Sequence, residues 1–171
     1  MNFETFEPIY EAILEDFGFG RRADERSRDV AAARATPFPI SRFDGWVDAT
    51  VAIVGAAPCL TAELDRVRSA DIVVAASTAV DVLSANDIAV DCMVTDLDKN
   101  PETAAARTDA GLPVVAHAHG DNVPAVREWL SRFDSDHTMV TTQAAPVGAV
   151  QNVGGFTDGD RAAFLADHVG A

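Results

Sequence analysis

Two carboxylates one residue apart stand near the middle of this sequence. Asp96 and Asp98 follow the apolar run 88–94, which predicts a buried strand, so both acids are expected where that strand ends in a loop. In open sheets of parallel strands, ligands bind at the carboxyl ends of the strands. Paired acids there suit Mg²⁺, which takes carboxylate oxygens and bridges to substrate phosphates. The alternative is that one of the two acids only caps a turn or helix.

A second polar cluster, His-Ala-His-Gly-Asp-Asn, spans residues 117–122 after another expected strand. His117 and His119 alternate, so they share a face of an extended chain. Asp121 follows a glycine and is a candidate third metal ligand or phosphate contact, with His119 as its polar partner. The alternative is that Asp121 or Asn122 caps the next helix. A zinc site is not favoured, because no third histidine stands at a fixed spacing.

Two glycine-containing segments add further candidates. In the segment 154–161, Asp158 and Asp160 either bind substrate or metal or cap the following helix, and Phe156 either stacks on a planar ring or packs in the core. Near the first strand, the segment 55–58 begins with Gly55 and resembles a strand–loop–helix start that receives phosphate on backbone N–H groups. It lacks the glycine spacing of a dinucleotide fold and the lysine of a P-loop.

The elements that must position these residues alternate along the chain. Apolar, β-branched runs predict strands at 50–54, 71–76, 88–95, 112–116 and 137–141, and a sixth at 149–153. Helices are expected between them at 60–69, 78–86, 101–110, 122–133 and 159–168. This alternation predicts a three-layer α/β fold, with a mostly parallel sheet flanked by helices and joined by right-handed crossovers.

The first 44 residues have a different pattern. Residues 3–17 carry apolar side chains at helical spacing, residues 21–35 predict a polar helix, and prolines mark a linker at 36–39. We therefore expect an N-terminal helical region over 1–44 and a catalytic α/β domain over 45–171. The arginines of the second helix either meet a phosphate or form a solvated face.

Composition excludes several classes of function. The chain has 171 residues, 48% of them hydrophobic, and a net charge of −14, so a globular domain is expected and a nucleic-acid partner is not. Only Lys99 of the 13 basic residues is a lysine, which is typical of a halophilic protein but also of an acidic protein from a GC-rich genome. No apolar run reaches membrane-spanning length and the N-terminus does not resemble a signal peptide, which predicts a cytoplasmic protein.

Four motifs in this order carry a resemblance to a known family: VTDLD (94–98), HAHGDN (117–122), TTQ (141–143) and NVGGFTDGDRAAFLA (152–166). They resemble the archaeal 6-hydroxymethyl-7,8-dihydropterin pyrophosphokinases, whose catalytic core is similar to that of thiamin pyrophosphokinase. The resemblance covers about residues 40–171. It implies Mg²⁺-dependent transfer of pyrophosphate from ATP to the pterin hydroxymethyl group, with small-molecule substrates as the only partners and a homo-oligomer left open.

The resemblance also implies roles for individual residues. Asp96, Asp98 and Asp121 would hold Mg²⁺ against the ATP phosphates, and Asp121 or His119 would accept the proton of the hydroxyl group. The nucleotide and acceptor pockets would be lined by Gly55, Ala57, Ser77, Thr142, Gln143, Asn152, Phe156, Asp158 and Asp160.

The sequence departs from the family pattern at three places. Cys59 replaces a serine after the first strand, and Ser77 stands where relatives usually have an aspartate. Relatives usually also continue beyond the final Gly-Ala, so a C-terminally short chain is expected. These departures leave open a catalytically impaired homologue that only binds nucleotide or pterin.

A phosphatase of the haloacid dehalogenase type is a further alternative, because Asp96-Leu97-Asp98 resembles its nucleophile motif. Two features oppose it: Asn100 stands where that motif has threonine, and the motif follows the third expected strand instead of the first.

Overall fold

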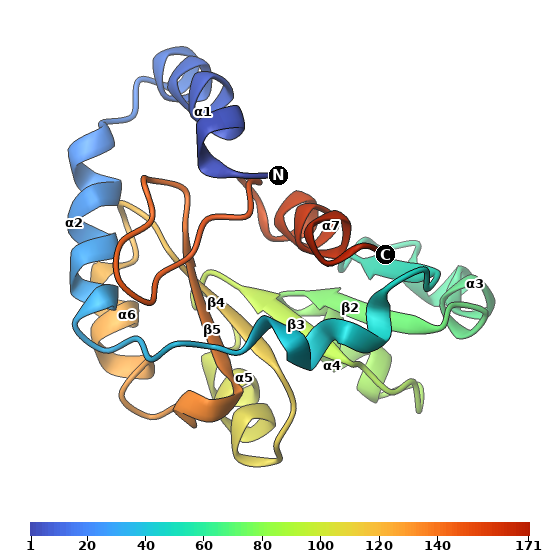
Figure 1. Ribbon diagram of the computed structural model, residues 1–171. Coiled ribbons are helices and arrows are strands. Elements are labelled where there is room, and N and C mark those ends of the chain that lie inside the picture. Colours follow the sequence, from blue (N-terminus) through green and yellow to red (C-terminus); the bar gives the residue numbers. More distant parts are fainter.

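The computed structural model describes residues 1–171 and forms an α/β fold around a five-stranded sheet (Figure 1). Its strands are β1 (Val51–Val54), β2 (Ile72–Ala76), β3 (Cys92–Thr95), β4 (Val114–Ala118) and β5 (Thr138–Thr142). All neighbouring pairs are parallel, and the strands lie in the order β1-β2-β3-β4-β5. The predicted α/β class with a parallel sheet is confirmed.

Helices precede, connect and follow the strands. The α-helices are α1 (Phe3–Phe17), α2 (Arg21–Ala32), α3 (Leu64–Arg68), α4 (Ala79–Ser84), α5 (Pro101–Asp109), α6 (Val123–Trp129) and α7 (Asp158–Val169). Short 3₁₀ helices are η1 (Ile40–Trp46), η2 (Leu60–Ala62) and η3 (Ser135–His137). None of the helices is long and apolar enough to cross a membrane.

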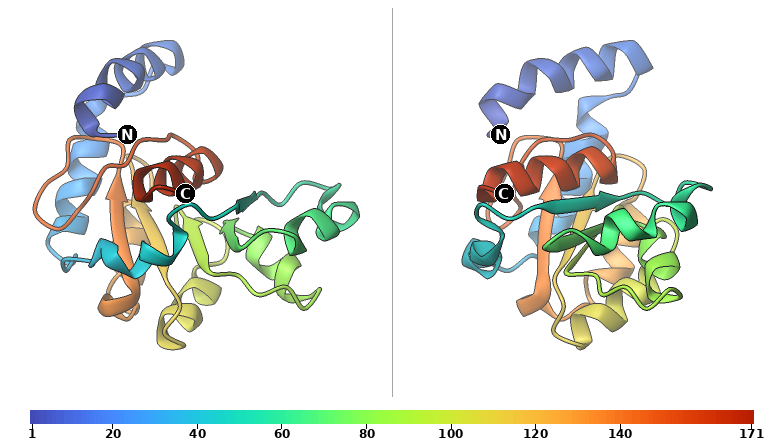
Figure 2. Two further views of the ribbon diagram at one scale, coloured as in Figure 1. Left: turned by 45° about the vertical axis from the view of Figure 1, so that its right-hand side comes forward. Right: turned by 90° about the vertical axis from the view of Figure 1, so that its right-hand side faces the viewer.

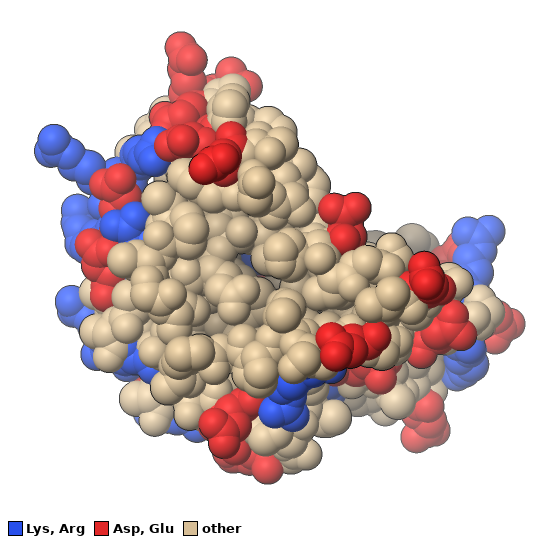
Figure 3. Space-filling model, in the orientation of Figure 1, with Lys and Arg blue, Asp and Glu red and all other residues tan.

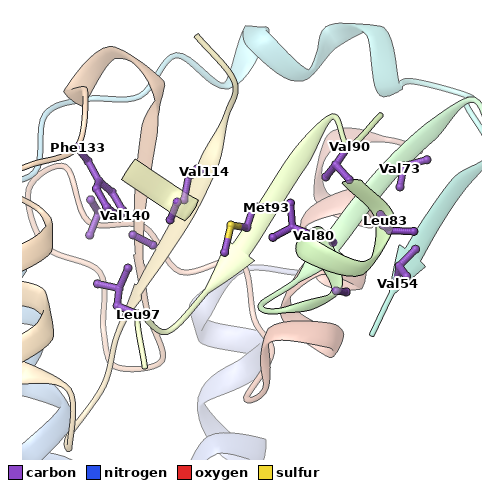
Figure 4. Packing of buried hydrophobic residues seen from close by; sticks show 14 of the residues in the cluster. Val54, Val73, Val80, Leu83, Val90, Met93, Leu97, Val114, Phe133 and Val140 are labelled. Atoms are coloured by element: carbon purple, nitrogen blue, oxygen red, sulfur yellow. The ribbon is translucent and has the colours of Figure 1, made fainter. Parts of the chain in front are cut away.

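The strand order explains the layers. Each crossover from β1 to β5 moves one strand in the same direction, and parallel crossovers share one hand, so α3 to α6 must cover the same face. Buried side chains of these helices and of the strands form one core on this face, including Leu64, Val80, Leu83, Met93 and Val114. Figure 4 shows several of them packed between the sheet and α4.

The opposite face is covered by segments from the two ends of the sequence. Successive side chains of a strand point to opposite faces, and here Val74, Val94 and Val115 belong to a second core. That core is closed by α7 and by η1, which contributes Phe43 and Trp46. The expected boundary between residues 44 and 45 thus falls inside η1, which packs on the sheet, and the division into two regions stays a prediction.

The first two helices differ in how they meet the sheet. Helix α2 packs along α6, β4 and β5, whereas α1 extends away from the body of the molecule (Figures 1 and 2). The buried side chains of α1 form a small cluster of their own, Phe6, Tyr10 and Leu14. Helix α1 is therefore held by a few specific contacts instead of by a shared core.

The sixth strand expected at 149–153 does not form. Gln151 makes one parallel bridge to Thr141, and its backbone exchanges two hydrogen bonds with the outer edge of β5. Gly154 and Gly155 then take left-handed φ angles of 92° and 88°, which turn the chain away from the sheet toward α7. A single β-bridge at Gln151 therefore pairs with the edge of β5 in place of a sixth strand.

Other elements are shorter than their apolar patterns suggest. β3 begins at Cys92 because Asp91 uses its side chain to accept from the Val73 N–H at 2.8 Å, while Ile88 and Val90 pack in the core without joining the ladder. The helix expected over 60–69 is divided into η2 and α3, and α2 ends at Ala32 instead of residue 35.

Gly120 permits the close approach of α2 to the end of β4. A Cβ atom at this position would lie 2.8 Å from the Cβ of Ala23, closer than side chains pack. We expect Gly120→Ala to displace α2 and to lower the free energy of unfolding by about 1–3 kcal/mol. Gly45→Ala, where a Cβ meets nothing within 4 Å, is the matched control. Urea unfolding of both variants measures the difference, and equal stabilities would contradict this account.

Candidate active site

A cavity of about 650 Å³ opens at the carboxyl ends of the strands. It is bounded by the five strand ends, the turn between α1 and α2, and the start of α7. Figure 3 shows the molecule in the orientation of Figure 1, with a hollow between α1 and α7. Few charged side chains lie around the centre of this face, and basic side chains gather along its edge over α2.

One cavity-lining residue follows or ends each strand, in the order of the sheet. They are Gly55, Ser77, Asp96, His119 and Gln143, after β1, β2, β3, β4 and β5. Neighbouring strands lie about 4.8 Å apart, so this row extends over roughly four strand spacings. The sheet order therefore places Asp96 in the middle of the cavity, with glycine and hydroxyl groups to one side and imidazole and amide groups to the other.

Asp96 is paired with the neighbouring strand end. Its Oδ2 lies 3.7 Å from Nε2 of His119, and both side chains are about two-thirds shielded, at 30% and 28% exposure. The contact with His119 is the largest cause that holds the pKa of Asp96 well below its usual range, so this carboxylate is charged at neutral pH. A permanent negative charge thus sits at the centre of the row.

The side chain of Asp98 contacts that of Asp96 but lies outside the cavity wall. Between them Leu97 takes a left-handed φ of 69° and buries its side chain in the core, while its N–H donates to Oγ1 of Thr95 at 3.0 Å. Asp98 is exposed, and its N–H donates to Oδ1 of Asp96 at 3.3 Å. Partial burial and the charge of Asp96 raise the pKa of Asp98.

Asn122 holds the central turn together. Its Nδ2 donates to the backbone carbonyls of Asp96 and His117, both at 2.7 Å. Its Oδ1 accepts from the backbone N–H of His119 and from the hydroxyl of Ser27, both at 3.0 Å. This buried amide joins the ends of β3 and β4 to α2, so it does not cap α6 with its side chain, which was the alternative considered from the sequence.

A buried ion pair lies at the start of α7. Arg161 is 2% exposed, and its Nη1 donates to Oδ1 of Asp158 at 3.0 Å while its Nη2 donates to the carbonyl of Phe156 at 3.0 Å. Burial lowers the pKa of Arg161 to about 10 and raises that of Asp158 to about 6, the latter against the opposing charge of Arg161. Gly155 is required here, because a Cβ would lie 2.5 Å from the Arg161 backbone.

Three polar atoms on the cavity wall have no hydrogen-bond partner within the chain. They are Oγ of Ser77, Nε2 of His117 and Nε of Arg161. Ser77 has a left-handed φ of 50°, fixed by its N–H bond to the carbonyl of Val94 at 2.8 Å. Buried polar groups are nearly always paired, so these atoms point to a polar ligand in this cavity.

Several residues predicted from the sequence are brought together here. The cavity wall includes eight of them: Gly55, Ser77, Asp96, His119, Asp121, Gln143, Phe156 and Asp158. His117 lines it too, with its ring centroid 6.0 Å from that of His119, as expected for alternate residues of an extended chain.

Other predicted residues lie outside the cavity wall, namely Ala57, Asp98, Thr142, Asn152 and Asp160. Thr142 and Asn152 bond the loop after β5, with Ala144 as their shared partner. Asp160 accepts from the backbone N–H groups of Phe156 and Thr157 and completes a capping box at α7. These side chains shape the loops that carry the site.

The structure adds wall residues that were not predicted, chiefly Phe19, Ala23 and Asp24 from the N-terminal helices and Lys99 after β3. Asp24 is 4% exposed and accepts from Gly120, Tyr10 and Gln143. The sequence does contain a pattern that indicates the buried side of α2. Asp24, Ser27 and Ala31 are short side chains at helical spacing, and they form that side.

The acids of the cavity suit a metal ion that takes some of its ligands from a bound substrate better than an ion held by protein ligands alone. No three His, Cys, Asp or Glu side chains are grouped to hold a metal ion by themselves, and the assignment of Asp96, Asp98 and Asp121 as metal ligands stays a prediction. Asp96 and Asp158 face the same cavity, and Asp121 lies exposed at its wall. Mg²⁺ is commonly bound by one or two carboxylates plus substrate phosphates, which this arrangement allows.

An open parallel sheet with a polar cavity at its carboxyl edge defines a ligand-binding α/β protein. Comparison with protein families is more specific. The chain belongs to the family described as "6-hydroxymethylpterin diphosphokinase MptE-like", whose model matches residues 32–171.

Relatives from three archaea are similar along almost the whole chain, and each is named 6-hydroxymethyl-7,8-dihydropterin pyrophosphokinase. The protein of Methanothermobacter thermautotrophicus is 41% identical over 95% of this chain and 71% of its own length. That of Pyrococcus furiosus is 35% identical over 100% and 74%, and that of Methanocaldococcus jannaschii 28% identical over 98% and 75%.

The ion pair at α7 predicts pH-dependent anion binding. With a pKa of about 6, Asp158 is charged above that pH and neutralises Arg161, whereas below it Arg161 keeps an unshared charge. We expect sulfate, which does not titrate here, to bind at least about tenfold more tightly at about pH 5 than at about pH 7.5. Calorimetric titration at constant ionic strength measures this.

Asp158→Asn is the variant that isolates the cause. It should bind sulfate tightly at both pH values, because no carboxylate then neutralises Arg161. A variant that keeps the full pH dependence would assign the effect to another group on the wall, such as His119, and would contradict this prediction.

Proposed function

We propose that this protein transfers a diphosphoryl group from ATP to the hydroxymethyl group of 6-hydroxymethyl-7,8-dihydropterin, with Mg²⁺ as the metal. Family membership supports the reaction class. The observation that carries the proposal is the row of strand ends, in which the charged Asp96 lies between a glycine and hydroxyl side and an imidazole and amide side. Two substrates bound from the two sides would meet at Asp96.

The two sides differ in what they can bind. At the ends of β1 and β2, Gly55 and the unpaired hydroxyl of Ser77 offer backbone and O–H donors to phosphate oxygens. Lys99 and Arg161 line the same cavity and add positive charge. We place the triphosphate on this side and the acceptor ring at the ends of β4 and β5.

The reaction needs positioning more than covalent help from the protein. The hydroxyl oxygen of the acceptor forms a bond to the β-phosphorus of ATP, and the bond from that phosphorus to the oxygen bridging to the α-phosphorus breaks. AMP leaves with the bridging oxygen. The hydroxyl proton passes to a base, for which His119 and Asp121 are our candidates on the wall.

Charge determines the division of roles. A carboxylate such as Asp96 repels a triphosphate directly, so its role requires a cation between them. When bound, Mg²⁺ would supply that cation and neutralise charge on the phosphates. Asp96 would hold it with Asp158 or Asp121, and Asn122 fixes Asp96 through its backbone carbonyl. His119, 3.7 Å from Asp96, is oriented by the same carboxylate.

Three further properties concern the partners, the cellular location and the salt tolerance of the protein. We propose that small molecules are the physiological partners, that the protein works in the cytoplasm, and that its acidic, lysine-poor surface suits high salt. The net charge of −14 supports the last point.

A second candidate is a homologue that binds nucleotide or pterin without turnover. Ser77 favours it, because its hydroxyl stands on the triphosphate side where the family pattern has an acid. Ser77→Asp should then restore turnover, whereas in an active enzyme it should not raise the rate.

The test is formation of AMP from ATP and the dihydropterin alcohol with Mg²⁺, at low and at molar salt. We expect AMP in stoichiometric amounts with the diphosphorylated pterin. Asp96→Asn should lower kcat/KM by about 10³-fold, since it removes the central charge. Asp44→Asn, an exposed acid away from the cavity, is the control and should leave the rate unchanged.

The outcomes separate the candidates. Binding of both substrates without AMP would reject the transferase and support the binding homologue. Release of phosphate from p-nitrophenyl phosphate, lost in Asp96→Asn, would instead support a phosphatase.

A further inference from the structure

We infer that Asp24, His117 and Gln143 form the subsite that binds the hydrogen-bonding edge of the acceptor ring, and that Asp24 selects a ring with an N–H donor there. The inference rests on the proposed function and adds to it the residues that distinguish the acceptor from other heterocycles. All three side chains line the cavity, and all three are buried.

Asp24 is a carboxylate with one acceptor position to spare. Its Oδ1 accepts from the Gly120 N–H at 2.6 Å, and its Oδ2 accepts from the hydroxyl of Tyr10 at 2.6 Å and from Nε2 of Gln143 at 2.9 Å. An ionised carboxylate has about four acceptor sites, so one remains. Its three donors are all neutral, and its charge therefore favours a polarised N–H group in the cavity.

His117 presents an unpaired ring nitrogen to the same space. Its Nδ1 lies 3.0 Å from Oγ1 of Thr141, and its Nε2 has no hydrogen-bond partner in the chain. Nε2 is therefore left to pair with a ligand, as an acceptor or as a donor according to which ring nitrogen carries the proton.

The surroundings keep this imidazole neutral. Burial is the main cause, and the positive charge of Arg161 adds to it, so the pKa of His117 lies well below its usual value. The ring is 1% exposed, so leaving Nε2 without a partner is unfavourable. A polar ligand atom directed at Nε2 would remove that cost.

Gln143 links these two groups. Its Nε2 donates to Asp24, and its side chain also contacts the ring of His117. The wall thus offers the spare acceptor site of Asp24 and the unpaired Nε2 of His117. A 2-amino-4-oxopyrimidine ring, as in a pterin, presents N–H groups next to a carbonyl oxygen, so it can donate to Asp24 and pair with Nε2.

Two aromatic residues on the wall offer surfaces on which this ring can stack. Phe19 and Phe156 line the cavity from the α1–α2 turn and the α7 loop, and each stacks on Phe17, with centroids 5.6 and 6.3 Å apart. Planar rings bind well against aromatic faces. The polar wall would then define the edge of the ring, and the aromatic pair its plane.

The test compares two ligands that differ only at this edge: 6-hydroxymethylpterin, with a 2-amino group, and 6-hydroxymethyllumazine, with a 2-oxo group. Binding to the full chain is followed by ligand fluorescence without ATP. We expect the native protein to prefer the pterin at least about tenfold, one charge-assisted hydrogen bond. In Asp24→Asn the pterin should bind about tenfold more weakly and the preference should disappear, since an amide can donate to the 2-oxo group.

Two further variants separate recognition from folding. His117→Phe removes the unpaired ring nitrogen but not the contacts of Asp24, and should weaken pterin binding about tenfold. Tyr10→Phe removes one bond to Asp24 from outside the cavity, and should lower the thermal stability while leaving the preference between the ligands intact.

The outcomes distinguish this inference from the proposed function. If the native protein prefers the pterin, folded Asp24→Asn keeps that preference and folded His117→Phe keeps the native affinity for the pterin, the recognition subsite lies elsewhere and the inference is overturned alone. If the native protein binds neither ligand, the proposed acceptor is wrong and the inference falls with it. If Asp24→Asn does not fold, His117→Phe decides.

Discussion

The hydrogen bonds of one buried carboxylate connect the two N-terminal helices to the functional edge of the sheet. Asp24 of α2 accepts from the end of β4 at Gly120, from the segment after β5 at Gln143, and from α1 at Tyr10. Helix α1 shares no core with the sheet, so this carboxylate and the ion pairs of Arg21 with Glu7 and Glu11 hold it in place. Removing one partner of a buried charge costs more than a typical surface contact, which makes Asp24 a constraint on both fold and cavity.

The sheet imposes the second constraint. Five parallel strands in sequential order bring five consecutive loops to one edge, and the same order sends all crossover helices to one face. The other face must then be covered by the chain before β1 and after β5, which is where η1 and α7 lie. Helix α7 covers this face and begins at the carboxyl edge of the sheet. Its first turn therefore brings Asp158 and Arg161 to the cavity wall.

Much of this arrangement follows from the sequence. Alternating apolar runs and helical segments predict the parallel sheet, and the polar residue after each run predicts its functional edge, so Asp96, His119 and Gln143 were expected near one another. The sixth strand was not distinguishable from an edge segment, because Val150 and Val153 are apolar for the core in either case. Likewise Asp98 was expected inside, since nothing in the sequence reveals the left-handed turn at Leu97 that directs it outward.

The polar side chains of α2 that sequence reasoning missed, Asp24 and Ser27, have partners that are distant in the chain. Asp24 and Gln143 are 119 positions apart, and Ser27 and Asn122 are 95 apart. A polar helix gives little warning that one acid on it is buried, because apolar periodicity, the usual signal of a buried face, is replaced here by small side chains. Such a face allows backbones to approach closely, as Ala23 and Gly120 do, and a short polar side chain between them can reach both elements. The N-terminal helices therefore complete the cavity, and the parallel sheet alone leaves its acceptor side open.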